Sequence, residues 1–190
     1  TGNKKQFTYK ELKEKVSKFA GALKNQGITI GDRVIIYMPM IPEAVIAMLA
    51  CGRIGAIHSV VFGGFASNEL ASRIDDSKAK LLVTASCGFE PGKTVEYKPL
   101  VDAAIKMASH KIDKMILFQR IDHTVKLNAP KEISWGEALS SAQEVDCVEM
   151  NSNDIAYILY TSGTTGTPKG IVRDIGGHIV ALKWTMKNIY

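Results

Sequence analysis

Glycine, threonine and lysine residues crowd into one short stretch of the 190-residue chain. Residues 160–170 read YTSGTTGTPKG, and five of the 16 glycines and four threonines lie between residues 161 and 177. A glycine-rich turn lets the backbone approach a ligand closely and point several N–H groups at one anion. Threonine hydroxyls add donors, and the lysine adds a mobile positive charge. This composition is typical of a site that holds a polyphosphate.

Within this stretch Lys169 is the candidate catalytic residue, and its neighbours supply the other groups. The residues expected to bind the ATP phosphates are Thr161, Ser162, Gly163, Thr164, Thr165, Gly166 and Lys169. The stretch is not a Walker A loop, because only two residues separate its glycines and Gly170 follows the lysine in place of Ser or Thr. This spacing disfavours a P-loop kinase or GTPase. An ordinary Gly/Thr surface loop is the alternative interpretation.

Short apolar strands alternate with helices along the chain and must position this turn. Strands are expected at residues 33–38, 56–61, 80–85, 114–119 and 155–160, and helices at residues 8–27, 43–54, 68–75 and 96–108. The alternation predicts an α/β fold with a doubly wound, mainly parallel sheet covered on both faces. In such sheets ligands bind beyond the carboxyl ends of the strands, where the glycine-rich turn follows residues 155–160.

Three further features of the sequence bear on this expected layout. The helix over residues 43–54 is apolar on nearly every side, which indicates a buried helix. Residues 120–153 interrupt the rhythm and are expected to form a connection with one short helix near Trp135, not a domain boundary. The chain begins without a methionine and stops within a helical pattern, so we interpret residues 1–190 as a single partial domain.

Charge and composition limit the classes of partner. The net charge of +5 arises in residues 1–33, which hold eight basic and three acidic side chains. A capping box of Thr8 and Glu11 predicts a helix there, and its lysines have no interleaved aromatic residues, so a solvated face is favoured over a nucleic-acid surface. The longest apolar stretch, residues 34–65, contains prolines and charges, so we expect no membrane span.

The cysteines and histidines offer little further chemistry. Three widely spaced cysteines without a CxxC pair predict neither a disulfide framework nor a zinc site, and they favour a reduced, intracellular compartment. His58 lies in an apolar strand and is expected to be a hydrogen-bonded core residue. His178 is a weaker candidate for lining a ligand pocket. Arg173 and Asp174 form either a structural ion pair or a support for the turn.

Residues 160–170 resemble the phosphate-binding signature of the adenylate-forming (AMP-binding) superfamily, which includes acyl-CoA synthetases and luciferases. The stretch HSVVFGGFAS at 58–67, followed by RID at 73–75, is similar to the short-chain acyl-CoA synthetases. The stretches GIVRD at 170–174 and GGHIVAL at 176–182 look closer to propionyl-CoA than to acetyl-CoA synthetases. The resemblance covers essentially all 190 residues and implies part of the large N-terminal domain.

The resemblance implies a two-step ligase that uses ATP, Mg²⁺ and coenzyme A. A short-chain carboxylate, propionate or acetate, would be joined to AMP and then transferred to the thiol of coenzyme A. The family's enzymes are several times longer, so this stretch is not expected to turn over by itself, and a non-catalytic nucleotide- or CoA-binding module is the alternative. The compartment implied is the mitochondrial matrix in a eukaryote or the cytoplasm in a bacterium. The oligomeric state stays open.

The same resemblance implies a second site, for the nucleotide end of coenzyme A. The residues assigned to it are Gly63, Gly64, Glu90, Pro91, Gly92 and Lys93. Acetyl-type relatives carry arginine at the position of Glu90, whereas propionyl-type relatives look acidic there. The alternative for residues 88–93 is a Pro-Gly β-turn with nothing bound. The alternative for the two adjacent glycines is a tight strand-to-helix turn.

Overall fold

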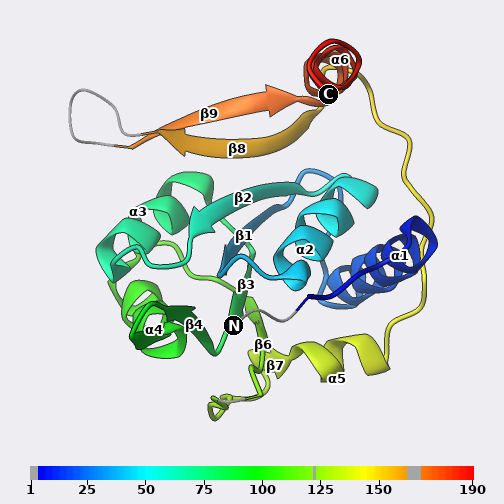
Figure 1. Cartoon of the computed structure of the whole chain (residues 1–190). Helices are drawn as coiled ribbons and strands as arrows, with labels where there is room; N and C mark the ends of the chain where they lie inside the picture. Colours follow the sequence, from blue (N-terminus) through cyan, green and yellow to red (C-terminus); the bar gives the residue numbers. More distant parts are fainter. Residues whose placement is uncertain (1–3, 122, 162–167) are drawn as a thin grey trace.

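The structure, a computed structural model, describes residues 4–121, 123–161 and 168–190, and within them seven strands form one sheet (Figure 1). Their order across the sheet is β7-β6-β3-β1-β2-β8-β9. The strands are β1 (Arg33–Met38), β2 (Ile57–Phe62), β3 (Leu81–Ala85), β6 (Lys114–Phe118), β7 (Glu132–Ser134), β8 (Ile155–Thr161) and β9 (Lys169–Asp174). Neighbouring strands run parallel except β9, which pairs antiparallel with β8.

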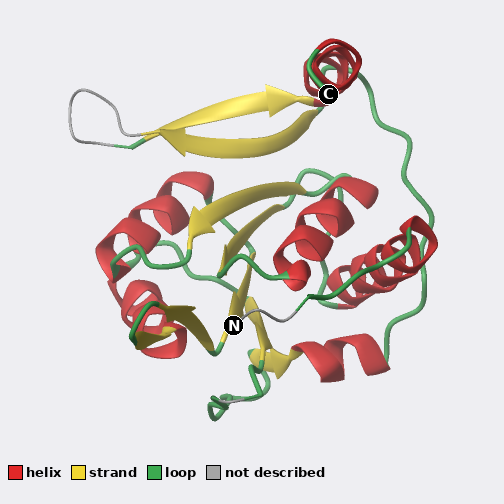
Figure 2. Ribbon diagram, viewed as in Figure 1, coloured by secondary structure: helices red, strands yellow, loops and turns green. Residues whose placement is uncertain are grey.

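Helices cover both faces of the sheet, which confirms the predicted doubly wound α/β fold (Figure 2). On one side lie α1 (Tyr9–Asn25), α2 (Pro42–Arg53) and α5 (Trp135–Ser140), and on the other lie α3 (Ser67–Ser77) and α4 (Tyr97–Met107). The short apolar strands form the centre because helices cover them on both faces; β3 is buried at all five positions.

Local signals set the helix boundaries that the sequence predicts. The Thr8 side chain accepts a hydrogen bond from the Glu11 backbone N–H at 3.2 Å, and the Glu11 carboxylate accepts one from the Thr8 N–H at 2.7 Å. The predicted capping box therefore begins α1. The short helix near Trp135 is also present, and the ring of Trp135 stacks on Phe19 with centroids 3.8 Å apart.

One expectation about the helices is wrong, and one predicted turn proves to join two paired strands. Helix α2 is not buried all round: Val45 and Leu49 are 47% and 46% exposed, because only the face carrying Ala47 and Ala50 packs inward. The structure also adds a hairpin of β4 (Cys87–Glu90) and β5 (Lys93–Glu96) where the sequence indicates only a turn. Gly92, with φ +77°, lies in the turn of that hairpin.

The C-terminal end of the chain is attached differently from the rest. Strand β8 joins the sheet through one residue pair, His58 with Tyr157, and then continues as the β8–β9 hairpin. Helix α6 (Ile175–Asn188) follows, and none of its residues is buried. Asp174 begins this helix by accepting the N–H of Gly177 at 2.5 Å, so it is a helix cap. Figure 1 shows the hairpin and α6 set apart from the layered part of the fold.

Candidate functional site

The two ends of the glycine-rich turn lie opposite each other at the carboxyl end of β8. Thr161, the last residue of β8, pairs with Lys169, the first residue of β9. Both side chains are exposed. The other residues expected to bind phosphate lie outside the described residues: Ser162, Gly163, Thr164, Thr165 and Gly166. The stretch therefore leaves a strand as predicted, but it leads into an antiparallel strand.

The base of this turn is fixed by contacts with α3. The Tyr160 hydroxyl donates to the Asp76 carboxylate at 2.6 Å. Desolvation, followed by the bond to Asp76, raises the pKa of the Tyr160 phenol well above its ordinary value, which keeps it a neutral donor. Opposite Tyr160 stands Gly170, where an added Cβ would lie 3.1 Å from the Tyr160 ring and 3.2 Å from Ile158. Glycine lets the two strands approach at this point.

A groove of about 760 Å³ lies at the carboxyl ends of β1, β2 and β6. Its lining includes Met38, Phe62, Gly63, Gly88, Phe89, Glu90, Tyr97 and Arg120. Two of the residues assigned to coenzyme A, Gly63 and Glu90, are in this lining. An added Cβ on Gly64 would lie 3.7 Å from the Glu90 carboxylate, so the structure brings the glycine turn and the hairpin together. Pro91, Gly92 and Lys93 lie on that hairpin, outside the lining.

Protein packing alone accounts for glycine at position 63. An added Cβ would lie 2.6 Å from the Met38 carbonyl oxygen and would overlap the Tyr97 hydroxyl. That hydroxyl donates to the Gly63 carbonyl, and burial raises the pKa of the Tyr97 phenol to about 12. At Gly88 an added Cβ would lie 2.5 Å from the same hydroxyl. Tyr97 thus joins the glycine turn to the hairpin, whatever the groove binds.

The charges around the groove differ in their availability to a ligand. Lys93 forms an ion pair with Glu90 at 3.0 Å, and both side chains are exposed. Arg120 lies with its guanidinium 4.8 Å from the centroid of the Phe89 ring. A planar cation on an aromatic ring is suited to an anionic group next to a flat base.

Four lining residues were not predicted from the sequence: Phe62, Phe89, Tyr97 and Arg120. Arg120 could have been found, because it follows the strand expected at residues 114–119 and so lies at its carboxyl end. Phe62 could have been found for the same reason, as the last residue of β2. Phe89 reaches the groove from β4, a strand that no pattern in the sequence predicts, and Tyr97 reaches it as the first residue of α4.

His58 and His178 are not among the residues that line this groove. His58 Nδ1 has no hydrogen-bond partner among the described residues, so the expectation of a hydrogen-bonded histidine is wrong. Burial, with a smaller effect of His178, lowers the pKa of His58 to about 4, and its ring stacks on Tyr157 with centroids 5.4 Å apart. The Nδ1 of His178 is 3.4 Å from the Tyr157 hydroxyl. The three rings form the seam between β2 and the C-terminal region.

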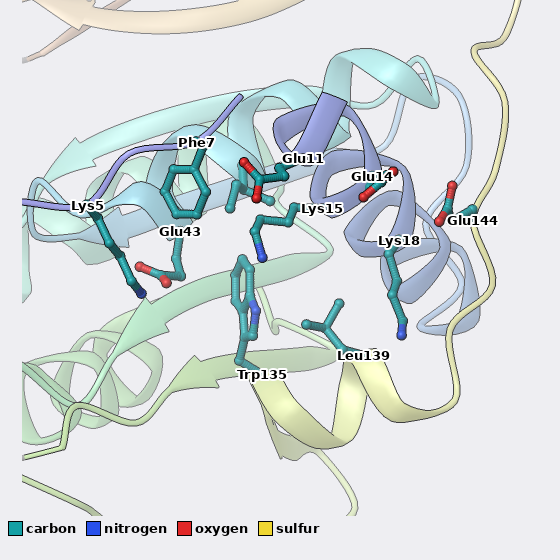
Figure 3. A pocket seen from close by; sticks show the side chains of 11 residues that line it. Lys5, Phe7, Glu11, Glu14, Lys15, Lys18, Glu43, Trp135, Leu139 and Glu144 are labelled. Carbon is teal, nitrogen blue, oxygen red and sulfur yellow. The ribbon is translucent and has the colours of Figure 1, made fainter. Parts of the chain in front are cut away.

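A second groove, of about 580 Å³, opens between α1, α2 and α5 (Figure 3). Carboxylates and ammonium groups alternate around Trp135 in its wall, among them Glu11, Lys15 and Lys18. Among the described residues, neither the ends of the glycine-rich turn, Thr161 and Lys169, nor Gly63 and Gly64 contribute to its lining. Its mixed charges select no ligand class, so it is not the candidate site.

Residues 4–121, 123–161 and 168–190, which the structure describes, contain no group of three or more His, Cys, Asp or Glu side chains placed to hold a metal ion. They also contain no helix with the length and apolar character that crossing a membrane requires.

Comparisons with known proteins agree with the fold. The "Acyl-CoA synthetase short-chain family member 3, mitochondrial" of Homo sapiens is 55% identical over 191 residues, covering 100% of this chain and 28% of that protein. The "Acetyl-coenzyme A synthetase" of Pasteurella multocida is 45% identical over 186 residues, covering 97% and 28%. The solved "Acetoacetyl-CoA Synthetase from Streptomyces lividans" superposes with a TM-score of 0.85 at 25% identity, covering 94% of this chain and 27% of that one.

The chain thus spans less than a third of the length of these relatives. The family described as "AMP-binding enzyme" matches residues 1–189. Because this match covers almost the whole chain, the chain belongs to the AMP-binding enzyme family.

Proposed function

We propose that the intact protein carrying this chain is an ATP-dependent acid–CoA ligase that forms AMP. Residues 1–190 would be one part of its AMP-binding domain. One observation carries the proposal: a Gly/Thr-rich turn that ends at Lys169, and a separate groove with Arg120 and Phe89, both stand at carboxyl ends of strands of one sheet. Two anionic substrates, ATP and coenzyme A, match two such places in a member of this family.

The first step joins the acid to AMP. A carboxylate oxygen forms a bond to the α-phosphorus of ATP, and the bond from that phosphorus to the pyrophosphate oxygen breaks. The departing pyrophosphate carries the charge. Backbone N–H and hydroxyl groups of the turn, beginning with Thr161, and the Lys169 ammonium would hold this charge without rearranging. Lys169 is exposed at the start of β9, where it can meet a phosphate.

The second step transfers the acyl group. The thiol of coenzyme A loses its proton, its sulfur bonds to the acyl carbon, and AMP leaves with the bonding electrons. The nucleotide end of coenzyme A would lie in the groove, with Gly63, Gly64 and residues 90–93 on one side. Phe62, which is 62% exposed, offers a surface on which a base can stack. Arg120 would meet a phosphate as a planar cation.

Magnesium enters only as the companion of the ATP phosphates. When bound there it neutralises charge on the phosphate oxygens. The described residues provide no carboxylate or histidine cluster to hold it.

Propionate is the first acid to test and acetate the second, because residues 170–182 look closer to propionyl-CoA synthetases. The protein would act inside the cell, in the mitochondrial matrix of a eukaryote or the cytoplasm of a bacterium. Several relatives are named as mitochondrial, whereas the acetyl-coenzyme A synthetase of Pasteurella multocida is bacterial.

The test is acid-dependent exchange of pyrophosphate into ATP by the intact protein, followed by thioester formation when coenzyme A is added. We expect exchange with propionate, and a loss of about 100-fold in its rate in Lys169→Ala. Lys106→Ala, which removes an exposed lysine from α4, is the matched control and should keep the wild-type rate. Nucleotide binding without acid-dependent exchange would instead support a non-catalytic binding module.

A further inference from the structure

Helix α3 lies between the two candidate binding sites, the groove beside the Gly63–Gly64 turn and the glycine-rich turn after β8. It begins at Ser67, just after the Gly63–Gly64 turn, and its Asp76 binds Tyr160 at the base of the phosphate turn (Figure 1). One charged side chain of this helix, Arg73, packs toward both.

Arg73 is a buried cation between two aromatic rings. Its guanidinium lies 5.0 Å from the centroid of Phe65 and 5.4 Å from that of Tyr160. The side chain is 7% exposed and forms an ion pair with the Glu69 carboxylate at 2.8 Å. The same nitrogen donates to the Glu69 carbonyl at 2.7 Å. A pair of flat rings accepts a planar guanidinium better than the compact ammonium of lysine.

Stability alone is a weak reason to bury a charge here. Taking a guanidinium out of water is costly, and apolar residues of similar volume often replace buried ion pairs without loss of stability. Position 73 follows Leu70 and precedes Ile74, both fully buried, so an apolar side chain would continue the buried face of α3. A cation at this position therefore suggests a role in geometry.

Each ring belongs to one of the candidate places. The carbonyl of Phe65 accepts the Tyr37 hydroxyl at 2.7 Å, so Tyr37 and Tyr97 hold the two ends of the glycine turn, at Phe65 and Gly63. Tyr160 directly precedes Thr161, where the phosphate turn begins. Phe65 and Tyr160 are 95 positions apart, and Arg73 contacts both.

We infer that Arg73 is a positioning residue for both substrates. It holds Phe65, at the end of the Gly63–Gly64 turn beside the groove, against Tyr160, at the base of the glycine-rich turn. This inference rests on the proposed function for the identity of the two ligands. Losing the guanidinium should let Phe65 and Tyr160 shift independently, so that both ligands bind more weakly. The inference assigns no contact with the carboxylic acid to either ring, so the acid should bind as before.

The experiment compares the intact wild-type protein with Arg73→Met and Arg73→Lys. Calorimetry measures the Kd of ATP and of coenzyme A, and kinetics measures the KM of ATP, coenzyme A and propionate. In Arg73→Met we expect both nucleotide Kd values to rise about tenfold, in keeping with a desolvated cation–π contact. The KM for propionate should stay within about twofold of wild type. Arg73→Lys should recover part of each loss, because the charge is kept and the stacking is not.

Lys98→Met is the control for a purely structural effect. Lys98 is also a cation with a 7% exposed side chain, paired with Asp102 at 2.5 Å and Glu132 at 3.2 Å, and it contacts neither ring. We expect this variant to lose stability without a change in either Kd. Unchanged Kd values in Arg73→Met, a rise for one nucleotide only, or equal rises in Lys98→Met would each overturn the inference.

Failure of the proposed function gives a different result. A wild-type protein that binds both nucleotides but shows no acid-dependent exchange would refute the ligase, while the Kd values would still decide the role of Arg73. A wild-type protein that binds neither nucleotide would refute both.

Discussion

The layered part of the chain is tightly packed, whereas its C-terminal region, from β8 to α6, is largely exposed. Strands β1 and β3 are buried on both faces, with helices on either side. By contrast, β9 is exposed at all six positions, and α6 leaves Val180, Trp184 and Met186 more than half exposed. Thr161 and Lys169, the described ends of the glycine-rich turn, belong to the second region. Their position therefore depends on a few specific contacts with α3 and β2, and less on a surrounding core.

A leucine-to-alanine substitution made once in each region should give the largest difference in stability between the two regions. Leu82→Ala in β3 removes a side chain with no exposed surface and should lower the free energy of unfolding by about 3 kcal/mol. Leu182→Ala in α6, where leucine is 47% exposed, should cost less than about 1 kcal/mol. Urea unfolding of the two variants measures both values. Equal losses would show that α6 packs as tightly as the central strands.

The seam between the regions should respond to acid through His58. Burial lowers its pKa from 6.5 to about 4, so between these values the unfolded chain binds the proton and the folded chain does not. The contribution of His58 to the free energy of unfolding is therefore fully present above pH 6.5. It falls as the pH drops toward 4, by at most about 3 kcal/mol. His58→Phe should flatten this part of the stability profile. An unchanged slope in that variant would assign the acid sensitivity to other groups.

Alanine substitution of two glycines that allow close approach of neighbouring atoms should repeat the order expected for the leucines: the variant in the layered part should lose more stability than the variant in the C-terminal region. Gly63→Ala forces a methyl group against the Met38 carbonyl and the Tyr97 hydroxyl, and should destabilise the chain by about 2 kcal/mol. Gly170→Ala meets the Tyr160 ring at 3.1 Å in the open C-terminal region, and should cost about 1 kcal/mol or less. Thermal unfolding ranks the two. The reverse order would mean that the β8–β9 hairpin is the more rigid region.

The smallest expected difference concerns two tyrosine hydroxyls. Tyr37→Phe leaves the Phe65 carbonyl without its buried donor and should cost about 1.5 kcal/mol. Tyr160→Phe frees only the exposed Asp76 carboxylate, which water can solvate, and should cost about 0.5 kcal/mol. Denaturant midpoints at neutral pH separate the two variants. A larger loss in Tyr160→Phe would make its bond to Asp76 the main anchor of the C-terminal region.

The sequence predicted what local patterns determine. The capping box at Thr8, the apolar strands and the placement of the glycine-rich turn after β8 follow from neighbouring residues. Strand β9 and the β4–β5 hairpin were missed because neither carries a run of buried apolar residues, and such strands form only when a partner strand is present. The position of Arg73 between Phe65 and Tyr160 joins segments far apart in the chain, and no periodicity encodes such a meeting. Which residues bind each substrate stays a prediction.

The two tyrosines beneath the glycine turn also make the groove observable without a label. Tyr37 and Tyr97 lie with ring centroids 5.1 Å apart, and burial raises the pKa of both phenols, that of Tyr97 to about 12. A phenol absorbs ultraviolet light differently once it ionises. An alkaline absorbance titration would therefore report the pH at which these two phenols become accessible to solvent and ionise. A shift of that pH on adding coenzyme A would be an optical signal from beside the groove.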